Sequence, residues 1–338
     1  MKSRLIITSI VAVIAAVTAG AAQAGGGQQW SDHRLTVETR NLFVGFDVGA
    51  ILASRITPAQ AWTNVLLSNP AGRAERWADE IADARPDVVG LQEAALFRTG
   101  PLLNPAPATS VVLDYVQLLV DALAERGLTY VPVAEARNID AEAPVGPPFF
   151  FDARVTDRDI LLVRADSQTG RLKVLDAQAG NYAFALHFGP VTASRGWAAA
   201  DLKLHGRTVR VVDTHLEAFA EAPRLIQASE LLAGPAASPG PTILLGDFNS
   251  GPPAPLPTYN LLTGTFADIW SALGLGPDLN CCHDDLTSAI PYDQRVDLVL
   301  ERNGISPLSA RVIGDVPGAS FPFFPSDHAG VVATVEID

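Results

Sequence analysis

The stretch Thr242-Ile-Leu-Leu-Gly-Asp-Phe-Asn-Ser250 places an acid and an amide directly after a short apolar run. The run Ile243–Leu245 has no polar residue and is typical of a strand that is covered on both faces. Gly246 favours a turn, so Asp247 and Asn249 should emerge at the carboxyl end of this strand, where loops often carry function. A single Asp-x-Asn is more often a turn than a site. The interpretation therefore depends on whether other polar strand ends converge on this one.

The composition is that of a large globular protein with an acidic surface. The chain has 338 residues, of which 48% are hydrophobic, and this is enough for a sizeable core. The formal net charge is −13, and no block of Lys and Arg residues occurs. An acidic surface disfavours non-specific binding to nucleic acid, although it does not exclude a nuclease with a local basic groove.

The N-terminus is typical of a secretory signal peptide. Lys2 and Arg4 precede an apolar run that ends at about Thr18, and Ala22-Gln23-Ala24 matches a cleavage site. The apolar run is too short to span a bilayer, which disfavours the alternative of an uncleaved membrane anchor. We therefore expect a secreted or periplasmic protein.

We expect three parts along the chain. Residues 1–24 should be the cleaved signal peptide, residues 25–34 a short lead-in, and residues 35–338 a single domain. The proline-rich stretches within the last part are too short to separate domains and are typical of surface loops.

The only cysteines, Cys281 and Cys282, are adjacent. They allow free thiols, a disulfide between neighbouring residues, or bonds to another molecule. In an oxidising compartment we favour the adjacent disulfide, which would stiffen the loop before the strand at Val296. With His283 they do not predict a zinc site, because no second ligand pair follows at a suitable spacing.

Strand-like and helix-like segments alternate through the chain, which indicates an α/β fold with at least some antiparallel strands. One hairpin is marked by the turn His205-Gly206. The expected strands are residues 35–43, 87–92, 130–136, 160–163, 172–175, 198–204, 209–214, 243–245, 296–300 and 331–337, and the expected helices are residues 71–84, 111–125 and 223–232.

Five polar motifs at strand ends occur in an order that resembles the endonuclease/exonuclease/phosphatase superfamily. They are Leu-Gln-Glu at 91–93, Asp-Thr-His-Leu at 213–216, Gly-Asp-Phe-Asn at 246–249, Arg-Val-Asp at 295–297 and Ser-Asp-His at 326–328, with Thr39-Arg40-Asn41 as a sixth match. The resemblance covers the chain from about Thr39 onward. It implies a four-layer sandwich, in which two packed mixed β-sheets are flanked by helices and the strand-end loops meet at the active site.

The resemblance implies hydrolysis of a phosphoester by metal-assisted attack of water. A hard cation must neutralise the phosphate, a base must deprotonate water, and donors must hold the non-bridging oxygens. Glu93 would be the main metal carboxylate, with Asn41 beside it and Asp327 assisting. Oxygen ligands favour Mg²⁺, with Mn²⁺ or Ca²⁺ as alternatives.

The same resemblance assigns catalytic roles to five residues. His328 would pair with Asp297 and would either accept the proton from water or hold a phosphate oxygen. Asp247 is the rival candidate for the base, with Asn249 positioning the nucleophile or the phosphate. His215 would donate to a phosphate oxygen.

Weaker candidates precede two of the strands. Arg158 and Asp159 lie where related enzymes place a phosphate-binding side chain, although a structural role for Arg158 is equally consistent with the sequence. Asp213 is expected to anchor the loop of His215. Arg195 is expected to be structural, with a contact to an active-site acid as the alternative.

The substrate is less well defined than the family. Two phenylalanine clusters, residues 149–151 and 321–324, would either reach the rim of the site and select the substrate or pack loops against the core. We expect a phosphodiester substrate, either nucleic acid or phospholipid. The alternatives are a phospholipase C-like or sphingomyelinase-like enzyme and, less favoured, a non-catalytic binding module. A monomer without a stable protein partner is expected, with transient contact to a membrane surface if the substrate is a lipid.

Overall fold

The computed structural model describes residues 33–165, 171–253, 256–276, 279–283, 285–287, 290–319 and 322–338. The expected signal peptide, residues 1–24, and all but the end of the expected lead-in lie outside the described residues. One compact unit, Asp32–Asp338, contains everything described below. Within the described residues, no helix is both long and apolar enough to cross a membrane.

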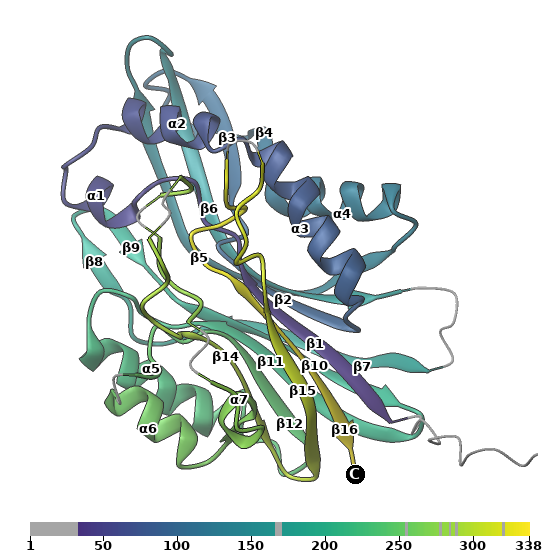
Figure 1. The fold of residues 1–338 in the computed structure, drawn as a ribbon. Coiled ribbons are helices and arrows are strands. Elements are labelled where there is room, and N and C mark those ends of the chain that lie inside the picture. Colours follow the sequence, from purple (N-terminus) through teal and green to yellow (C-terminus); the bar gives the residue numbers. More distant parts are fainter. Residues whose placement is uncertain are drawn as a thin grey trace, which may run out of the picture. The chain divides into compact units, whose positions relative to one another are not determined.

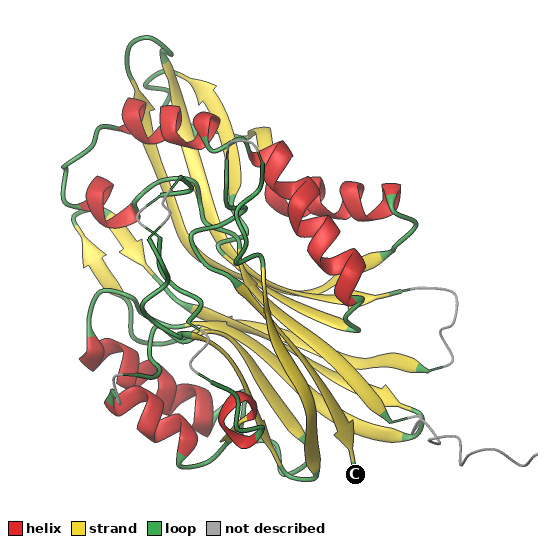
Figure 2. Cartoon of the chain, in the orientation of Figure 1, coloured by secondary structure: helices red, strands yellow, loops and turns green. Residues whose placement is uncertain are grey.

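The expected four-layer α/β sandwich is confirmed. Two mixed sheets of 10 and 6 strands pack face to face, and helices cover the outer face of each (Figures 1 and 2). The larger sheet contains β1 (Arg34–Asn41), β2 (Val88–Gln92), β3 (Leu96–Pro101), β4 (Ser110–Asp114), β5 (Tyr130–Val145), β6 (Phe151–Arg164), β8 (Leu186–Phe188), β9 (Val191–Ala193), β15 (Ile305–Ile313) and β16 (Gly330–Ile337). The smaller sheet contains β7 (Leu172–Asn181), β10 (Gly196–Leu204), β11 (Arg207–His215), β12 (Thr242–Asp247), β13 (Ala267–Asp268) and β14 (Asp297–Arg302).

The core between the sheets consists of aliphatic side chains that alternate along the strands. Val37 of β1 and Val88 of β2 meet Ile243 and Leu245 of β12 in one buried cluster. Gly90 lies where β2 approaches the smaller sheet closely, and a Cβ atom at this position would collide with Leu245 and Asp213. The sequence therefore needs glycine here so that the two sheets can approach each other.

Helices form the two outer layers. The helices α3 (Pro70–Ala84) and α4 (Tyr115–Glu125) cover the larger sheet, and Trp77 and Ile81 of α3 are fully buried, as their spacing predicts. The helices α5 (Glu221–Ala233), α6 (Pro257–Thr263) and α7 (Ile269–Ala272) lie on the smaller sheet (Figure 1). The short α1 (Val48–Leu52) and α2 (Pro58–Leu67) extend the connection between β1 and β2.

Within the described residues each sheet contains one parallel strand pair, and these pairs determine where the polar strand ends lie. In the larger sheet β1 runs parallel to β2, and in the smaller sheet β11 runs parallel to β12. The carboxyl ends of parallel strands meet at the same edge of a sheet. The polar residues after β1 and β2, and after β11 and β12, are therefore brought together in pairs.

Several expected elements have different boundaries in the structure. The helix expected at residues 111–125 begins only at Tyr115, because Asp114 caps it by accepting from the Val116 amide at 3.1 Å and the residues before it form β4. Gly246 does not end its strand: β12 continues through Asp247, and Gly246 accommodates a φ of 145° within it. The strands β5 and β6 are much longer than expected and form an extended antiparallel ribbon.

We did not predict α2 from the sequence, although the residues at its N-terminus are typical of a helix start. Thr57 and Gln60 form a capping box, and Pro58 occupies the first helical position. The helix buries Ala61, Trp62 and Val65 but exposes Leu66 and Leu67, so its hydrophobic periodicity is weak.

Candidate active site

The register of the strands aligns the polar strand ends side by side. In the smaller sheet, His215 pairs with Asp247 across β11 and β12, and Asp247 pairs with Asp297 across β12 and β14. In the larger sheet, Asn41 pairs with Gln92, so that Glu93 follows immediately. Neighbouring strands lie about 4.8 Å apart, so these pairings bring the side chains within contact distance.

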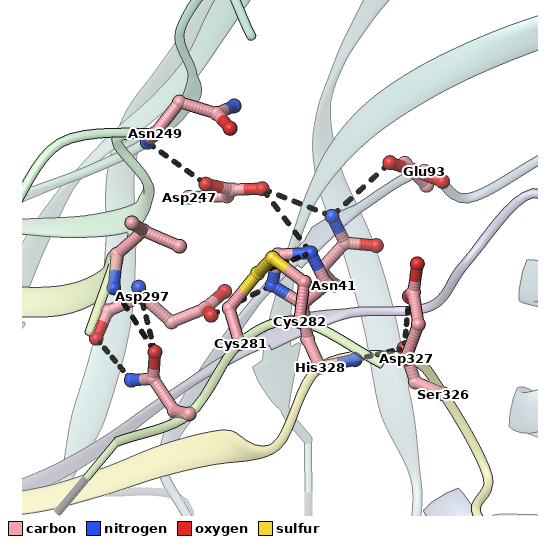
Figure 3. Close-up of a disulfide and its surroundings, with 12 residues drawn as sticks. Asn41, Glu93, Asp247, Asn249, Cys281, Cys282, Asp297, Ser326, Asp327 and His328 are labelled. Carbon is pink, nitrogen blue, oxygen red and sulfur yellow. Dashed lines mark hydrogen bonds and ion pairs between the residues drawn. A yellow bond between two sulfur atoms is a disulfide. The ribbon is translucent and has the colours of Figure 1, made fainter. Parts of the chain in front are cut away.

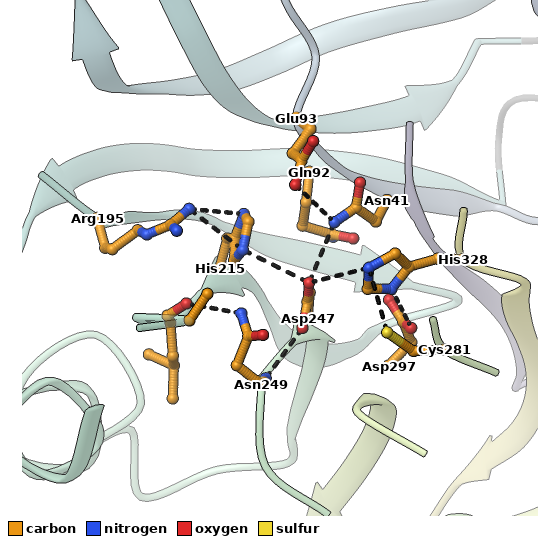
Figure 4. Close-up of polar contacts among 12 residues, drawn as sticks. Asn41, Gln92, Glu93, Arg195, His215, Asp247, Asn249, Cys281, Asp297 and His328 are labelled. Carbon is orange, nitrogen blue, oxygen red and sulfur yellow. Dashed lines mark hydrogen bonds and ion pairs between the residues drawn. The ribbon is translucent and has the colours of Figure 1, made fainter. Parts of the chain in front are cut away.

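Asp247 lies at the centre of this group (Figure 4). Its Oδ2 atom is 3.1 Å from Asn41 Nδ2, 3.5 Å from His215 Nε2 and 3.8 Å from His328 Nε2. Its Oδ1 atom accepts from the backbone amide of Asn249 at 2.9 Å. Burial alone would raise the pKa of Asp247, but the two histidines and the hydrogen bonds outweigh it and hold the pKa below its usual value.

His328 lies between two carboxylates. Its Nδ1 atom is 2.8 Å from Asp297 Oδ2, and its Nε2 atom faces Asp247 (Figures 3 and 4). Burial opposes a charged ring, but the attraction of Asp297 and Asp247 raises the pKa of His328 well above its usual value. The ring is therefore positioned as a cation that is oriented by Asp297.

His215 has the opposite environment. The Arg195 guanidinium lies 3.1 Å from Nδ1 and 3.2 Å from Nε2 of the ring. Burial and this positive neighbour lower the pKa of His215 to about 3, so the ring is neutral at ordinary pH. The two histidines beside Asp247 thus differ in charge.

Glu93 and Asn41 approach Asp247 from the larger sheet. Asn41 Nδ2 lies 3.2 Å from Glu93 Oε1 and 3.1 Å from Asp247 Oδ2, so one amide group lies between the two carboxylates. The amide of Phe43 donates to Asn41 Oδ1 at 2.9 Å, and the amide of Val44 donates to Glu93 Oε2 at 2.7 Å. These backbone contacts hold both side chains in place.

Asp327 completes the acidic side of the site. Burial and the nearby Glu93 raise the pKa of Asp327 to about 6, although His328 opposes this shift. A divalent cation would stabilise the charged form of a carboxylate that lies beside another acid, and oxygen donors fit a hard ion such as Mg²⁺. Asp247, Asp297 and His328 form a second group that could hold a metal ion, since their ligand atoms all lie within 4.8 Å of one another.

The loop before β14 contributes positioning groups that the sequence did not indicate. Asn280 is fully buried, accepts from the Val296 amide at 3.0 Å and donates to the Asp297 carbonyl at 2.8 Å. Cys281 and Cys282 form the expected adjacent disulfide, and Cys281 Sγ lies 3.5 Å from His328 Nε2 (Figure 3). The sequence indicates the cysteine pair but neither its contact with His328 nor the role of Asn280, so only the fold reveals these contacts.

Arg158 and Asp159 do not reach the site. Arg158 is buried on the other face of β6, where it contacts Asp114 Oδ1 at 2.5 Å and the Ala94 carbonyl at 2.8 Å. Asp159 is fully buried and does not line the pocket. Asp157 lines it instead, and burial together with Glu93 raises its pKa to about 6. This corrects the expectation of a phosphate-binding side chain at positions 158 and 159.

Asp213 and Arg195 both contact polar residues near the site. Asp213 is fully buried and accepts from Gln92 Nε2 at 2.6 Å, so it links the strand before His215 to the strand before Glu93. Arg195 lines the pocket beside His215 and lies 3.9 Å from both Asp157 and Glu217. Arg195 therefore contacts acids at the site, which is the alternative given in the sequence analysis to a purely structural role.

A pocket of about 590 Å³ opens at these residues. Its polar end is formed by Glu93, Asp157, Arg195, His215, Asp247, Asn249, Asp327 and His328. None of the described residues of the two phenylalanine clusters lines it. Phe149 and Phe151 pack against the core beside Trp62 and Phe324 packs on His283, whereas Phe150 and Phe323 are exposed and Phe321 lies outside the described residues. Of the two readings, packing against the core describes three of these phenylalanines, and contact with a ligand in the pocket describes none of those in the described residues.

The sequence model of the endonuclease/exonuclease/phosphatase family matches residues 61–328. The chain belongs to this family. It is therefore a phosphoester hydrolase, and enzymes of this family depend on divalent metal ions. A search among curated proteins returned no match.

Solved structures with the same fold are distant in sequence. An endonuclease/exonuclease/phosphatase protein from Bacteroides vulgatus is 19% identical, with a TM-score of 0.58 over 90% of this chain and 99% of that one. D. rerio TDP2 in complex with a single-strand DNA product is 19% identical, with a TM-score of 0.53. The match covers 90% of this chain and 99% of that chain. A mannosyl-6-phosphatase from Bacteroides thetaiotaomicron is 14% identical, with a TM-score of 0.56. The match covers 89% of this chain and 99% of that chain.

Proposed function

We propose that this family member is a metal-dependent phosphodiesterase in which Asp247 activates the attacking water. The observation that carries the proposal is the contact of Asp247 Oδ2 with a neutral His215 on one side and a cationic His328 on the other. His328 Nδ1 is engaged with Asp297 at 2.8 Å, and the two carboxylates that flank the ring raise its pKa well above the usual value, so the ring keeps its proton rather than accepting one from water. Asp247 is the acceptor that remains between them.

The surrounding residues would divide the remaining work. His328 and Arg195 supply positive charge for the non-bridging oxygens, and Asn249 positions the group that Asp247 deprotonates. Glu93, Asn41 and Asp327 would hold the metal ion, for which we favour Mg²⁺. The ion, when bound, neutralises the phosphate and the leaving oxygen. Asp297 keeps His328 charged and oriented through the contact at 2.8 Å.

Charge favours a diester over a monoester. Among the described residues that line the pocket, Arg195 is the only Arg or Lys, whereas Glu93, Asp157, Asp247 and Asp327 are acidic. A phosphate monoester carries a charge of about −1.5 to −2 at neutral pH, and a diester carries a single charge. The acidic residues of the pocket therefore repel a diester less than a monoester. The lipid alternative has no support inside the pocket, because the exposed Phe150 and Phe323 lie outside its lining.

Hydrolysis of bis(4-nitrophenyl) phosphate and nicking of supercoiled plasmid test this proposal. We expect hydrolysis with Mg²⁺, none with EDTA, and a loss of at least about 100-fold in kcat/KM for Glu93→Gln. The exposed Glu125 at the end of α4 gives the matched control, since Glu125→Gln should keep full activity. Equal rates for Glu93→Gln and the wild type, or faster hydrolysis of 4-nitrophenyl phosphate than of the diester, would overturn the proposal.

We also propose that the protein is exported and processed after Ala24. The charged start, the apolar run and the Ala-x-Ala site support this. Mass spectrometry of the protein recovered from outside the inner membrane should give a chain that begins at Gly25. An intact N-terminus in the cell lysate would contradict export.

A further inference from the structure

The pocket continues from the catalytic residues into an apolar chamber between α2 and the β5–β6 ribbon. We define the apolar chamber by Phe46, Trp62, Phe97, Ala141, Ala143 and Ala153, all of which line the pocket. Ala143 lies opposite Ala153 in the register of the ribbon. Because side chains alternate along a strand, Ala141 and Ala143 face the same side, and these small residues leave room beneath α2.

Trp62 of α2 faces this floor of small residues. Phe97 belongs to the floor itself, because it pairs in register with Val155, which lies on the same face of β6 as Ala153. Trp62 is 8% exposed, and its ring meets Phe97 edge-on at 6.0 Å and Phe151 at 5.1 Å, which holds the indole in one orientation. A fixed indole above a floor of small residues favours a flat ring over a flexible chain, because ring contacts add to the gain from burial.

The apolar chamber offers little to a hydrogen-bonding ligand. The described residues that line the pocket include no Ser, Thr, Tyr or Gln. Of the two acids near the chamber, each has one oxygen engaged by the backbone: Asp47 accepts from the Ala50 amide at 2.8 Å, and Glu142 accepts from the Ala108 amide at 2.9 Å. A nucleobase would lose hydrogen bonds to water here without replacement, and a second phosphate would meet no Lys or Arg.

From these observations we infer that the apolar chamber binds an uncharged aromatic group that is esterified to the phosphate. The inference rests on the proposed phosphodiesterase function, because the polar end of the same pocket would hold the phosphorus. It assigns Ala143 and Ala153 as residues that determine specificity by leaving space, and Trp62 as the residue that contacts the ring.

Calorimetric titration with four phosphate monoesters, used as product analogues in the presence of Mg²⁺, tests the inference without turnover. They are methyl, benzyl and heptyl phosphate and thymidine 5′-phosphate. We expect benzyl phosphate to bind at least about tenfold tighter than methyl phosphate, since the chamber removes one ring from water. Heptyl phosphate, with the same number of carbon atoms as benzyl phosphate, should bind less tightly than benzyl, and thymidine 5′-phosphate no tighter than methyl phosphate.

Two variants fill the apolar chamber, and one matched variant does not. Ala143→Phe and Ala153→Phe should each remove the preference for benzyl phosphate while binding methyl phosphate as before. Ala179→Phe makes the same chemical change at an exposed position of β7, away from the pocket, and should keep the preference. Thermal unfolding of each variant checks that it is folded, and the wild-type comparison stands without any variant.

The outcomes separate this inference from the proposed function. Hydrolysis of bis(4-nitrophenyl) phosphate without a preference for benzyl phosphate would overturn the inference alone. A preference for heptyl phosphate or thymidine 5′-phosphate would also overturn it, in favour of an alkyl chain or a nucleobase. A preference for benzyl phosphate that the filling variants remove, in a protein without phosphodiesterase activity, would support the chamber and overturn the proposed function.

Discussion

The Oδ2 atom of Asp247 is shared by Asn41, His215 and His328, which come from three distant parts of the chain. The motifs that contain these residues could be recognised in the sequence, because a strand end with an acid, amide or histidine is a local pattern. The charge of each histidine could not be predicted. It depends on Arg195 beside one ring and Asp297 beside the other, and these neighbours are set by the fold.

A buried acid away from the site should make stability depend on pH. Glu38 of β1 is 1% exposed, and its oxygens have no hydrogen-bond partner among the described residues. Burial and the nearby Glu80 raise its pKa from 4.5 to about 8, against the attraction of Arg40. The folded state therefore keeps a proton that the unfolded chain releases. The stability from this group is fully present below pH 4.5 and is lost as the pH rises through 8.

Glu38→Gln should remove this dependence. The free energy of unfolding of the variant, relative to the wild type, should rise between pH 5 and 8 by up to about 1.4 kcal/mol per pH unit. Urea unfolding at pH 5, 6.5, 8 and 9 measures the difference. The exposed Glu125→Gln provides the control, whose difference from the wild type should stay constant. A constant difference for Glu38→Gln as well would show that Glu38 is ionised in the folded protein.

At the scale of elements, the predictions were most accurate where one face of a strand or helix is polar. The helix α3 and the hairpin of β10 and β11 have such patterns and lie where the sequence places them. The strand β6 is buried on both faces around residues 157–162, so its sequence does not reveal which residues face the pocket. The sequence pattern therefore cannot show that Asp157, rather than Arg158, faces the pocket, and the placement of Arg158 depended on the family resemblance alone.

The close approach of the two sheets at Gly90 should tolerate no side chain. Gly90→Ala would place a methyl group against Leu245 and Asp213, so we expect a loss of at least about 2 kcal/mol in the free energy of unfolding. Gly146→Ala, in the turn between β5 and β6, meets no atom within 4 Å and should change stability by less than about 0.5 kcal/mol. Urea unfolding of both variants makes the comparison, and equal stabilities would show that the sheets can separate locally.

At the scale of the whole molecule, net charge should govern the interaction with polyanions. A protein that makes 6 to 10 phosphate contacts loses about 10³ to 10⁵ in affinity between 50 and 200 mM salt. This chain has a net charge of −13 and only Arg195 as an Arg or Lys among the described residues that line the pocket. We therefore expect its affinity for DNA to change by less than about tenfold over the same range, as measured by fluorescence anisotropy. A steep loss would reveal a basic surface outside the pocket.

Whole-molecule properties were predictable to different extents. The layered architecture follows from the alternation of strands and helices together with the family resemblance, and the structure confirms it. The apolar chamber was not predictable, because it is built from alanines on two strands and aromatic residues on three other segments. None of these residues forms a motif, and their proximity depends on how α2 crosses the β5–β6 ribbon.

Arg40 of β1 donates to the carbonyl of His328, a residue 288 positions later in the chain. A ribosome that adds about 5 to 20 residues per second needs on the order of 14 to 58 seconds to pass from one to the other. During this interval the growing polypeptide lacks His328, so β1 has no partner for this contact. The order in which the strands are synthesised thus delays the assembly of the polar strand ends until almost the entire domain has been translated.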